Sequence, residues 1–210
     1  MSAIFELSGV TKNFGGVRAV SEMSFSIPEG ELAGLMGPNG AGKTTIFNLV
    51  TGVYDPDEGS ILFRGENLVP LKTFDIVHKG IARTFQNLRL FQRSSVLENV
   101  MTAAQQHVPY TFFEGMTHLG RWRSKESDIR KKSMELLERV GLADRANQAA
   151  GTLPYGHQRR LEIARALALD PKLLLLDEPA AGMNAEEVLS LNSLIRSIHT
   201  DFKLTILVIE

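Results

Sequence analysis

The sequence contains no cysteine, and this absence excludes a disulfide scaffold and any metal site built from thiolates. It also lacks any run of the roughly 18 to 20 consecutive apolar residues that a helix needs to cross a bilayer. The N-terminal stretch MSAIFELSGV does not show the basic and then apolar layout of a signal peptide. These absences predict a protein of the cytosol or of the membrane periphery.

Neither sign of charge is in excess. The 210-residue chain carries 23 Lys and Arg against 24 Asp and Glu, which gives a formal net charge of −1. We therefore expect no overall attraction to nucleic acid or to an anionic membrane. The histidines show none of the spacings of metal ligands, so we assign them no metal. A hydrophobic content of 43% is that of an ordinary globular protein with a substantial core.

The first third of the chain is predicted to form short strands separated by turns. Phe5 and Leu7 alternate with polar residues, as do Met23, Phe25 and Ile27, and this alternation predicts half-buried strands. The other elements expected here are a strand at 31–36, a helix at 42–50 that stops at Gly52, and strands at 60–63 and 81–85.

From about residue 90 the expected elements are mainly helices. Ser95 with Glu98 predicts a capping box, and Asn184 with Glu187 predicts the cap of a later helix. The predicted helices run to 104, to 141, over 158–168 and to 198, and buried strands are expected at 173–176 and 204–209. We therefore predict an α/β fold in which a helical insertion interrupts a mainly parallel sheet, with an antiparallel β layer near the N-terminus.

A glycine-rich turn lies between the predicted strand 31–36 and the predicted helix 42–50. It fits the phosphate loop, in which backbone N–H groups surround phosphate oxygens at the positive end of a helix. Its residues are Gly37, Pro38, Asn39, Gly40, Ala41, Gly42, Lys43 and Thr44. Lys43 is expected to reach the β- and γ-phosphates of ATP, and the Thr44 hydroxyl to bind Mg²⁺. The alternative is a glycine turn with a surface lysine, but the flanking strand and helix favour the phosphate loop.

The magnesium ion of a phosphate loop needs an acidic partner at the end of a buried strand. Asp177 directly follows the predicted buried strand 173–176, and we expect it to hold Mg²⁺ directly or through water. Glu178 comes next, and its carboxylate is expected to face the γ-phosphate as a general base or a water-positioning group. The alternative, that both residues merely begin a surface turn, is weakened by the presence of Lys43 in the same chain.

A third segment, residues 153–167, is not required by a phosphate loop alone. Its sequence is LPYGHQRRLEIARAL, and with GPNGAGKTT and LLLLDEP it resembles the motifs of the ABC ATPases over essentially the whole chain. The resemblance implies a P-loop NTPase core that works as a head-to-tail dimer, in which the signature of one subunit closes on the γ-phosphate held by the other. It adds Thr45 to the nucleotide-binding residues and assigns the contact in trans to Pro154, Tyr155, Gly156 and His157.

The resemblance also implies roles for residues whose own signals are weak. Phe14 corresponds to an aromatic that stacks on adenine, and a core aromatic is the open alternative. Gln86 corresponds to a glutamine that reaches toward Mg²⁺ and the transmembrane partner, and it joins Glu178 as a catalytic residue. The segment that crosses the dimer interface contains Ala181, Gly182 and Asn184. Asn184 can be a helix cap at the same time.

Three features depart from the family pattern. Pro154, Tyr155 and Gly156 replace the Ser-Gly-Gly of many members, so we expect a weaker contact in trans that uses backbone groups only. Asn184 stands where aspartate is usual, which puts the dimer-crossing hydrogen bonds in question. The sequence ends at Glu210, before the switch histidine of the pattern, so we expect a truncated chain that binds ATP but hydrolyses it weakly alone.

The finer resemblance is to the ATPase subunit of high-affinity branched-chain amino-acid importers. It rests on RTFQNLRLF at 83–91, on the LPYG form of the signature and on EPAAGMN at 178–184. It implies ATP as substrate, Mg²⁺ as cofactor and a peripheral position on the cytoplasmic face of the inner membrane. The implied partners are permease subunits, a second ABC ATPase in a homo- or heterodimer and, indirectly, an external binding protein. The expected division is a nucleotide-binding core at 1–88 and 158–210 around a helical subdomain at 89–157.

Two alternatives stay open: an ABC ATPase of another transport system, and a nucleotide-gated ABC protein without a transport role. The second usually has tandem domains or a long coiled-coil insertion, and neither is found here. The balanced charge also offers no basic stripe for nucleic acid. The segment 107–123, which contains the only tryptophan, is expected to pack within the helical subdomain, with a permease-facing surface as the alternative.

Overall fold

The computed structural model describes residues 3–107 and 121–210, and the chain divides into two compact units. The first unit comprises residues up to Gln86 together with Pro171–Ala181 and Ile195–Glu210. The second comprises Asn87–Asp170 and Gly182–Leu194. The segment 107–123, for which packing within the helical subdomain is predicted, lies outside the residues whose side chains are described.

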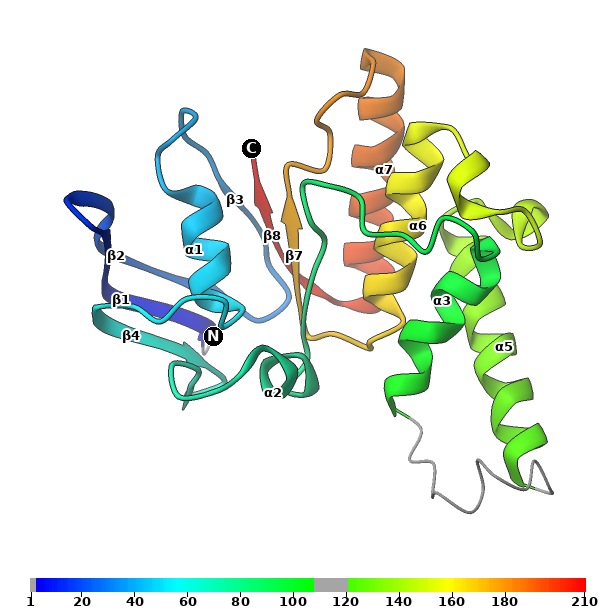
Figure 1. Cartoon of the computed structure of the whole chain (residues 1–210), viewed down its shortest axis with the longest axis horizontal. Coiled ribbons are helices and arrows are strands. Elements are labelled where there is room, and N and C mark those ends of the chain that lie inside the picture. Colours follow the sequence, from blue (N-terminus) through cyan, green and yellow to red (C-terminus); the bar gives the residue numbers. More distant parts are fainter. Residues whose placement is uncertain (1–2, 108–120) are drawn as a thin grey trace. The chain divides into compact units, whose positions relative to one another are not determined.

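The elements follow one another in a mixed α/β order (Figure 1). The strands are β1 (Ala3–Phe14), β2 (Val17–Pro28), β3 (Leu32–Leu35), β4 (Glu58–Phe63), β5 (Glu66–Asn67), β6 (Ile81–Arg83), β7 (Leu173–Asp177) and β8 (Thr205–Ile209). The α-helices are α1 (Lys43–Val50), α2 (Thr73–His78), α3 (Val96–Ala104), α5 (Arg121–Arg139), α6 (Tyr155–Leu167) and α7 (Ala185–Phe202). Short 3₁₀ turns lie at Gln105–His107, Ala143–Arg145 and Ala150–Thr152.

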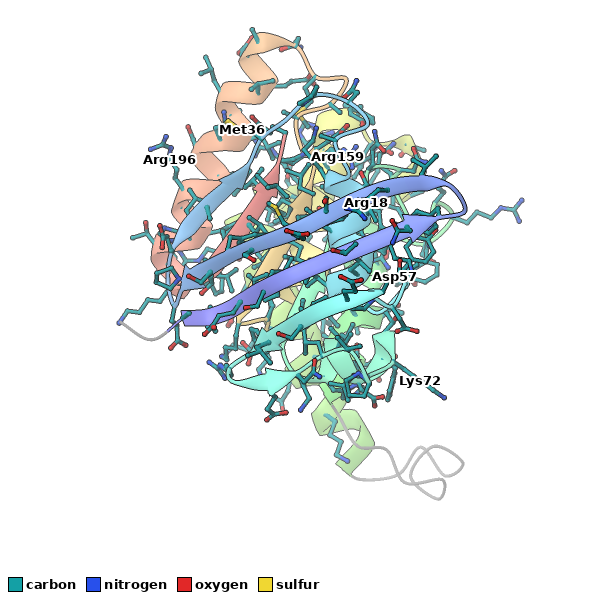
Figure 2. The ribbon with its side chains drawn as sticks, turned by 90° about the vertical axis from the view of Figure 1, so that its left-hand side faces the viewer. Arg18, Met36, Asp57, Lys72, Arg159 and Arg196 are labelled. Atoms are coloured by element: carbon teal, nitrogen blue, oxygen red, sulfur yellow. The ribbon has the colours of Figure 1, made fainter. Side chains whose placement is uncertain are left out.

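An antiparallel sheet with the order β2-β1-β4-β5 forms one layer of the first unit (Figure 2). Phe5 of β1 is paired in register with Ile27 of β2 and with Phe63 of β4. These three side chains are buried, as the alternation of apolar and polar residues predicts for a sheet with one covered face. The predicted antiparallel layer is therefore confirmed.

The second sheet of this unit has the order β3-β8-β7-β6, and all its strand pairs are parallel. Every residue of β7 is buried, which agrees with a strand covered on both faces. Leu35 of β3 and Asp177 of β7 are both aligned with Ile209 of β8. The carboxyl ends of β3 and β7 consequently meet at one edge of the sheet.

Helix α1 lies between the two sheets and fills the core of the first unit (Figure 1). Its buried Phe47 and Val50 belong to the same apolar cluster as Phe63 of the antiparallel sheet and Leu175 of the parallel sheet. At about 25 cal/mol per Å² of apolar surface removed from water, such side chains hold the layers together. The core therefore fixes α1 between the two sheets.

The second unit is helical. Helix α3 packs against α5 and α6, and α5 also contacts α6. Ser95 and Glu98 form the predicted capping box at the start of α3. Helix α7 begins in this unit and ends in the first one. No helix in the described part of the chain is long and apolar enough to span a bilayer.

The predicted elements are present, with shifts at some ends. Helix α6 begins at Tyr155, three residues before the predicted start at residue 158, and β6 ends at Arg83 rather than at residue 85. Helix α7 continues to Phe202, beyond the predicted end at 198. The sequence patterns did not predict the short elements α2 and β5.

Candidate functional site

The glycine-rich turn connects β3 with α1, as the phosphate-loop pattern predicts. Gly40 and Gly42 both have a φ of 83°, a left-handed conformation that glycine adopts without strain. A Cβ on Gly42 would lie 2.2 Å from the carbonyl oxygen of Ala19 on β2. Gly42 is therefore required both for the turn and for the close approach of the loop to β2.

Lys43 is the first residue of α1, and it is 7% exposed. Its ammonium group donates hydrogen bonds to the carbonyls of Gly37 and Pro38, the latter at 3.0 Å. The side chain thus lies along the loop that precedes its own helix. A cation held there by carbonyl groups is placed to meet phosphate oxygens that the loop N–H groups surround.

The sheet register brings Asp177 to the same edge as this loop. Leu35 precedes the loop by two residues and pairs with Ile209, which also pairs with Asp177. Two neighbouring strand spacings separate the ends of β3 and β7 by about 10 Å. Lys43 and Asp177 therefore belong to one edge of the sheet, where open parallel sheets bind their ligands.

The two carboxylate oxygens of Asp177 have different surroundings. The side chain is buried, and its Oδ2 accepts a hydrogen bond from Nη2 of Arg83 at 2.7 Å. Its Oδ1 is buried and has no hydrogen-bond partner among the residues that the structure describes. An oxygen of this kind fits a hard cation such as Mg²⁺ or a water bound to one.

The described residues contain no group of three or more His, Asp and Glu side chains that could enclose a metal ion. Mg²⁺ at phosphates is usually bound by few protein ligands and several waters. Thr44 lies in the first turn of α1 and is exposed, so its hydroxyl is free to reach a bound ion. The residues present therefore fit the predicted Mg²⁺ site.

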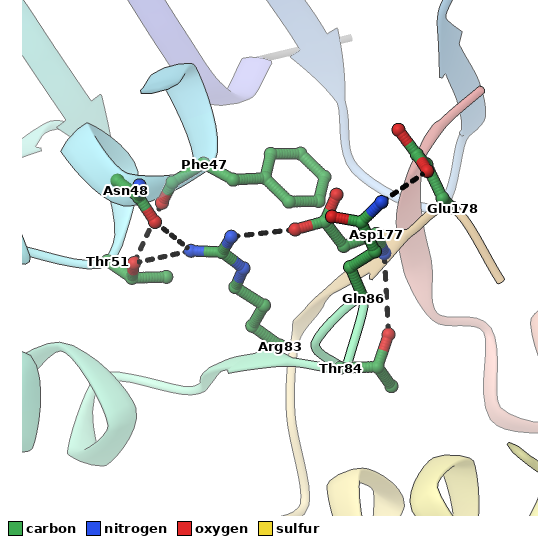
Figure 3. A network of polar contacts seen from close by, with 8 residues as sticks. All are labelled: Phe47, Asn48, Thr51, Arg83, Thr84, Gln86, Asp177 and Glu178. Carbon is green, nitrogen blue, oxygen red and sulfur yellow. Dashed lines mark hydrogen bonds and ion pairs between the residues drawn. The ribbon is translucent and has the colours of Figure 1, made fainter. Parts of the chain in front are cut away.

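Glu178 and Gln86 are in direct contact. Nε2 of Gln86 donates a hydrogen bond to Oε2 of Glu178 at 2.8 Å (Figure 3). Glu178 has a φ of 43°, a strained left-handed conformation for a residue with a side chain. Its N–H donates to the carbonyl of Ile209 at 3.0 Å, which holds this conformation in place. The structure thus brings the two predicted catalytic residues together beside Asp177.

Arg83 belongs to this cluster, although the sequence patterns gave it no role (Figure 3). It ends β6, the strand next to β7, and it links Asp177 to Asn48 of α1 and to Thr51, the C-cap residue of that helix. The available signal was an arginine within the predicted strand 81–85, three residues before Gln86. A charged residue in that place needs a buried partner.

Phe14 lies at the end of β1 and is 42% exposed, so the alternative of a core aromatic does not hold. Its ring meets the ring of Tyr54 edge-on, with 5.1 Å between the centroids. The Lys12 ammonium lies 5.6 Å from the Phe14 centroid. One face of an exposed aromatic fits a nucleotide base, and stacking on adenine stays a prediction.

Asp57 holds Lys12 in place beneath Phe14. It accepts hydrogen bonds from the Lys12 ammonium at 2.8 Å and from the Asn13 N–H at 2.6 Å. The Lys12 hydrogen bond, followed by that of Asn13, lowers the pKa of the Asp57 carboxyl below its usual value. The sequence patterns missed both Tyr54 and this small network.

The signature residues occupy the start of α6 in the second unit. Pro154 is the N-cap residue, with no side-chain cap, and Tyr155, Gly156 and His157 form the first turn. Because Pro154 has no hydroxyl where many family members have serine, the hydrogen-bond donors of this turn are its backbone N–H groups. Burial, and then the charge of Arg145, lowers the pKa of His157.

Gly156 and Gly182 stand where larger residues would meet neighbours in the same unit. A Cβ on Gly156 would lie 3.1 Å from Oε1 of Glu187, and one on Gly182 would lie 3.7 Å from the ring of Tyr155. Asn184 and Glu187 exchange hydrogen bonds at 2.9 and 3.1 Å, which is the predicted cap of α7. Ala181 is the last residue of the segment Pro171–Ala181 of the first unit, and Gly182 begins a segment of the second.

A family model described as "ABC transporter" matches residues 20–181, which include the phosphate loop, the signature and the Asp177 strand. The chain belongs to this ABC transporter family. It is therefore an ABC ATPase, and the resemblance drawn from the sequence is confirmed together with the predicted fold class.

Named relatives of this ABC ATPase include two bacterial proteins that match 99% of the chain and are themselves covered to 81%. One is the high-affinity branched-chain amino acid transport ATP-binding protein BraF of Pseudomonas aeruginosa, at 42% identity. The other is the high-affinity branched-chain amino acid transport ATP-binding protein LivG of Escherichia coli strain K12, at 41% identity. A probable LivG of Archaeoglobus fulgidus is 36% identical over 86% of the chain and 69% of its own length.

Solved structures of ABC cassettes have the same fold. The ADP conformation of MJ1267, an ATP-binding cassette of an ABC transporter, matches the whole chain with a TM-score of 0.85 and 28% identity, and 82% of that structure is covered. The CbiO1 protein of Clostridium perfringens, part of an ABC transporter complex, also matches the whole chain with a TM-score of 0.85, at 26% identity and 78% coverage.

Proposed function

We propose that this ABC ATPase binds Mg-ATP at the carboxyl edge of its parallel sheet and hydrolyses it to drive the import of branched-chain amino acids. The observation that carries the proposal is the grouping of three features at that edge. They are the loop that ends in Lys43, the buried Asp177 with one unpartnered oxygen, and the hydrogen-bonded pair of Glu178 and Gln86. ATP as the nucleotide is supported by the ATP-binding relatives.

Each of these residues has a distinct part in the proposed reaction. The N–H groups from Gly37 to Thr45 and the Lys43 ammonium bind the phosphates, and Phe14 stacks on the adenine. Thr44, Asp177 and Gln86 are the residues that would hold Mg²⁺, which supplies positive charge to the β- and γ-phosphates when bound. Glu178 orients a water toward the γ-phosphate and accepts its proton, and the Gln86 amide fixes the direction of that carboxylate.

The second nucleotide-binding surface is proposed to come from another ATPase subunit. The first turn of α6, from Pro154 to His157, presents backbone N–H groups at a helix N-terminus, a geometry that suits a γ-phosphate held by a partner. Ala181, Gly182 and Asn184 are proposed to cross that interface. Tyr155 replaces a smaller residue of the family pattern, so the closed dimer is expected to be weaker than in members with Ser-Gly-Gly.

The membrane partners are proposed from the relatives. Identities of 41 and 42% to proteins named for high-affinity branched-chain amino acid transport support a complex with permease subunits and an external binding protein. The chain then sits peripherally on the cytoplasmic face of the inner membrane. Residues 89–157 are proposed to be the helical subdomain that receives the permeases, between the core parts 1–88 and 158–210.

The experiment that tests this function compares the wild-type chain with Glu178→Gln and with the exposed control Glu186→Gln. We expect Glu178→Gln to lower ATP hydrolysis about 10²- to 10⁴-fold, because a general base contributes on that scale. The ATP affinity of Glu178→Gln is expected to equal that of the wild type. We also expect this variant to accumulate as an ATP-bound dimer, which size-exclusion chromatography detects. An unchanged hydrolysis rate in Glu178→Gln would remove Glu178 from the proposed role.

The transport part has its own test. Uptake of labelled leucine, isoleucine and valine is measured in cells that carry either the wild type or Glu178→Gln as their only copy of this gene. We expect the variant to lose high-affinity uptake of these amino acids and to keep uptake of an unrelated solute. Retained branched-chain amino acid uptake would contradict the proposed substrate class while leaving ATP binding untouched.

A further inference from the structure

We propose that Arg83 is a positioning residue for the magnesium-binding carboxylate. It holds Oδ2 of Asp177 so that Oδ1 alone is left for the ion, and it ties that carboxylate to the helix that carries the phosphate loop. This inference rests on the proposed function and deepens it, and it assigns Arg83 a role through Asp177 rather than through a contact of its own with nucleotide or metal.

The first support is the pairing of two buried charges. The side chains of Arg83 and Asp177 are 5% and 2% exposed, and Nη2 lies 2.7 Å from Oδ2. A guanidinium N–H pointing at a carboxylate oxygen at this distance is a strong, directional bond. Because Oδ2 is occupied, the rotation of the Asp177 carboxylate is fixed, and Oδ1 stays without a partner among the described residues.

The second support is a pair of hydrogen bonds that the other terminal nitrogen of the same guanidinium makes. Nη1 of Arg83 donates to Oδ1 of Asn48 at 2.7 Å and to Oγ1 of Thr51 at 3.3 Å (Figure 3). Asn48 belongs to α1, the helix that begins with Lys43. One planar group therefore links the phosphate-loop helix to the metal-binding strand.

The third support is the way the guanidinium is confined. It lies 5.3 Å from the ring centroid of Phe47 and 5.1 Å from that of Phe85. Aromatic rings attract a cation at these distances and exclude water from it. Two aromatic rings, the side chains of Asn48 and Thr51, and Asp177 thus hold Arg83 in one orientation.

This arrangement requires arginine in particular. Its planar fork directs N–H groups to two sides at once, whereas the ammonium of lysine is a single point charge. A lysine at this position would pair with Asp177 or with Asn48, and an apolar residue with neither. In both cases the position of Oδ1 relative to the phosphate loop becomes less fixed, and Mg²⁺ affinity should fall before nucleotide affinity does.

The test measures ATP affinity of the whole chain by calorimetry over a series of Mg²⁺ concentrations and in EDTA. Loss of a residue that orients a metal ligand typically lowers metal affinity about 10- to 100-fold. The Mg²⁺ midpoint is the Mg²⁺ concentration that gives half of the maximal gain in ATP affinity. We expect Arg83→Met to raise this midpoint by at least about tenfold, and Arg83→Lys to raise it less. Affinity for ATP in EDTA is expected to match that of the wild type. The exposed pair Arg64–Glu29 supplies the matched control, Arg64→Met, which should leave the Mg²⁺ midpoint unchanged.

A double-mutant cycle with Asp177→Asn distinguishes action through Asp177 from general damage. If Arg83 acts through Asp177, then adding Arg83→Met to Asp177→Asn produces little further shift of the Mg²⁺ midpoint. Additive shifts would overturn the inference, as would an equal loss of ATP affinity with and without Mg²⁺. If circular dichroism shows that Arg83→Met does not fold, the Arg83→Lys variant decides: a raised Mg²⁺ midpoint supports the inference and an unchanged one overturns it.

The wild type separates this inference from the proposed function. If the wild-type chain shows no gain of ATP affinity with Mg²⁺, the proposed function itself fails. If the wild type shows the gain and Arg83→Met keeps the same Mg²⁺ midpoint, only the role of Arg83 is removed.

Discussion

Both units of this ABC ATPase contain a buried pair of arginine and carboxylate, and the two pairs are built differently. In the first unit Arg83 reaches Asp177, which is 94 residues away in the chain, and the carboxylate keeps one buried oxygen without a partner among the described residues. In the second unit Arg159 pairs with Glu162, which lies about one turn further along the same helix, and Nη1 of Arg159 is 3.1 Å from Oε2 of Glu162. Nη2 and Nε of Arg159 donate to the Tyr155 hydroxyl at 2.8 and 3.2 Å.

The comparison shows how a buried ion pair can be assigned to function or to structure. Burying charges costs free energy that a well-formed pair only offsets, so an oxygen left unpaired is an additional cost with no structural benefit. The Glu162 pair is local and leaves no buried oxygen of that residue unsatisfied in the described chain. The Asp177 pair retains such an oxygen at the sheet edge beside the phosphate loop, which is where a bound cation would satisfy it.

The largest expected difference between the pairs concerns hydrolysis. Asp177→Asn should lower the ATPase rate about 10²- to 10³-fold, because it removes a charge that stabilises the transition state through Mg²⁺. Glu162→Gln is the matched change in the second unit, and the rate per folded molecule should stay as in the wild type. ATPase assays at saturating ATP and Mg²⁺ measure both. Equal losses in the two variants would break the distinction.

The next largest effect is on stability. Arg159→Met removes the buried ion pair with Glu162, and breaking a buried pair costs about 3 to 5 kcal/mol. Urea denaturation followed by circular dichroism measures the loss, with the exposed Arg130→Met as control. A loss below about 1 kcal/mol would show that the pair is solvated or dispensable, in contrast to its burial.

A smaller effect is expected at the exposed aromatic pair of the first unit. Tyr54→Leu removes the ring that meets Phe14 edge-on, and aromatic pairs contribute about 0.5 to 1.5 kcal/mol. ATP affinity should fall by about threefold to tenfold if Tyr54 positions Phe14 for the adenine. Calorimetry measures this, and Phe202→Leu at another exposed aromatic is the control. Unchanged affinity would separate Tyr54 from nucleotide binding.

The smallest effect concerns acid stability, for which each unit again supplies an exposed carboxylate. Hydrogen bonds lower the pKa of Asp57, chiefly from Lys12, and that of Glu98, chiefly from the Ser95 N–H. A carboxyl whose pKa is lower in the folded state stabilises the fold above its unfolded pKa, about 4, and loses this contribution as the pH falls through the folded value.

We therefore expect Lys12→Met to make the stability of the chain less dependent on pH between about 5 and 3. Thermal unfolding over that range is the measurement. Glu98 keeps its capping box in this variant, so some acid dependence should remain. A steeper loss of stability on acidification than in the wild type would contradict the assignment to Lys12 and Asp57.

Much of the fold could be predicted because its signals are local. The alternation around Phe5 and the capping box of Ser95 and Glu98 depend on neighbouring residues, and the structure confirms both. The elements that escaped prediction are short. Helix α2 has six residues and β5 has two, and such elements form through tertiary packing rather than through their own propensity.

The early start of α6 has a similar explanation. Tyr155 and Gly156 are weak helix formers, and Gly in particular suggested a loop before residue 158. In the structure Pro154 occupies the N-cap, and a Cβ on Gly156 in the first turn would lie only 3.1 Å from Oε1 of Glu187. The close neighbour of Gly156 is 31 positions away in the chain, and no local pattern indicates it.

The residues of the candidate site likewise fall into two groups, those that local motifs predict and those that only the fold brings together. The residues from Gly37 to Thr44, Asp177 and Glu178 have local motifs and were predicted from them. Arg83 and Tyr54 act through contacts with residues distant in the chain, and only the sheet register and the packing of α1 bring these together. Their place in the site is a property of the fold rather than of a motif.

The measurement that tests the account most directly is the ATP affinity of Lys43→Ala beside that of the exposed control Lys131→Ala. A hydrogen bond to a charged group contributes about 1.5 to 3 kcal/mol, so Lys43→Ala should weaken ATP binding at least about tenfold, with or without Mg²⁺. Lys131→Ala should bind ATP as the wild type does. Undiminished affinity in Lys43→Ala would contradict a nucleotide site at the phosphate loop and the roles given to Asp177, Glu178 and Arg83.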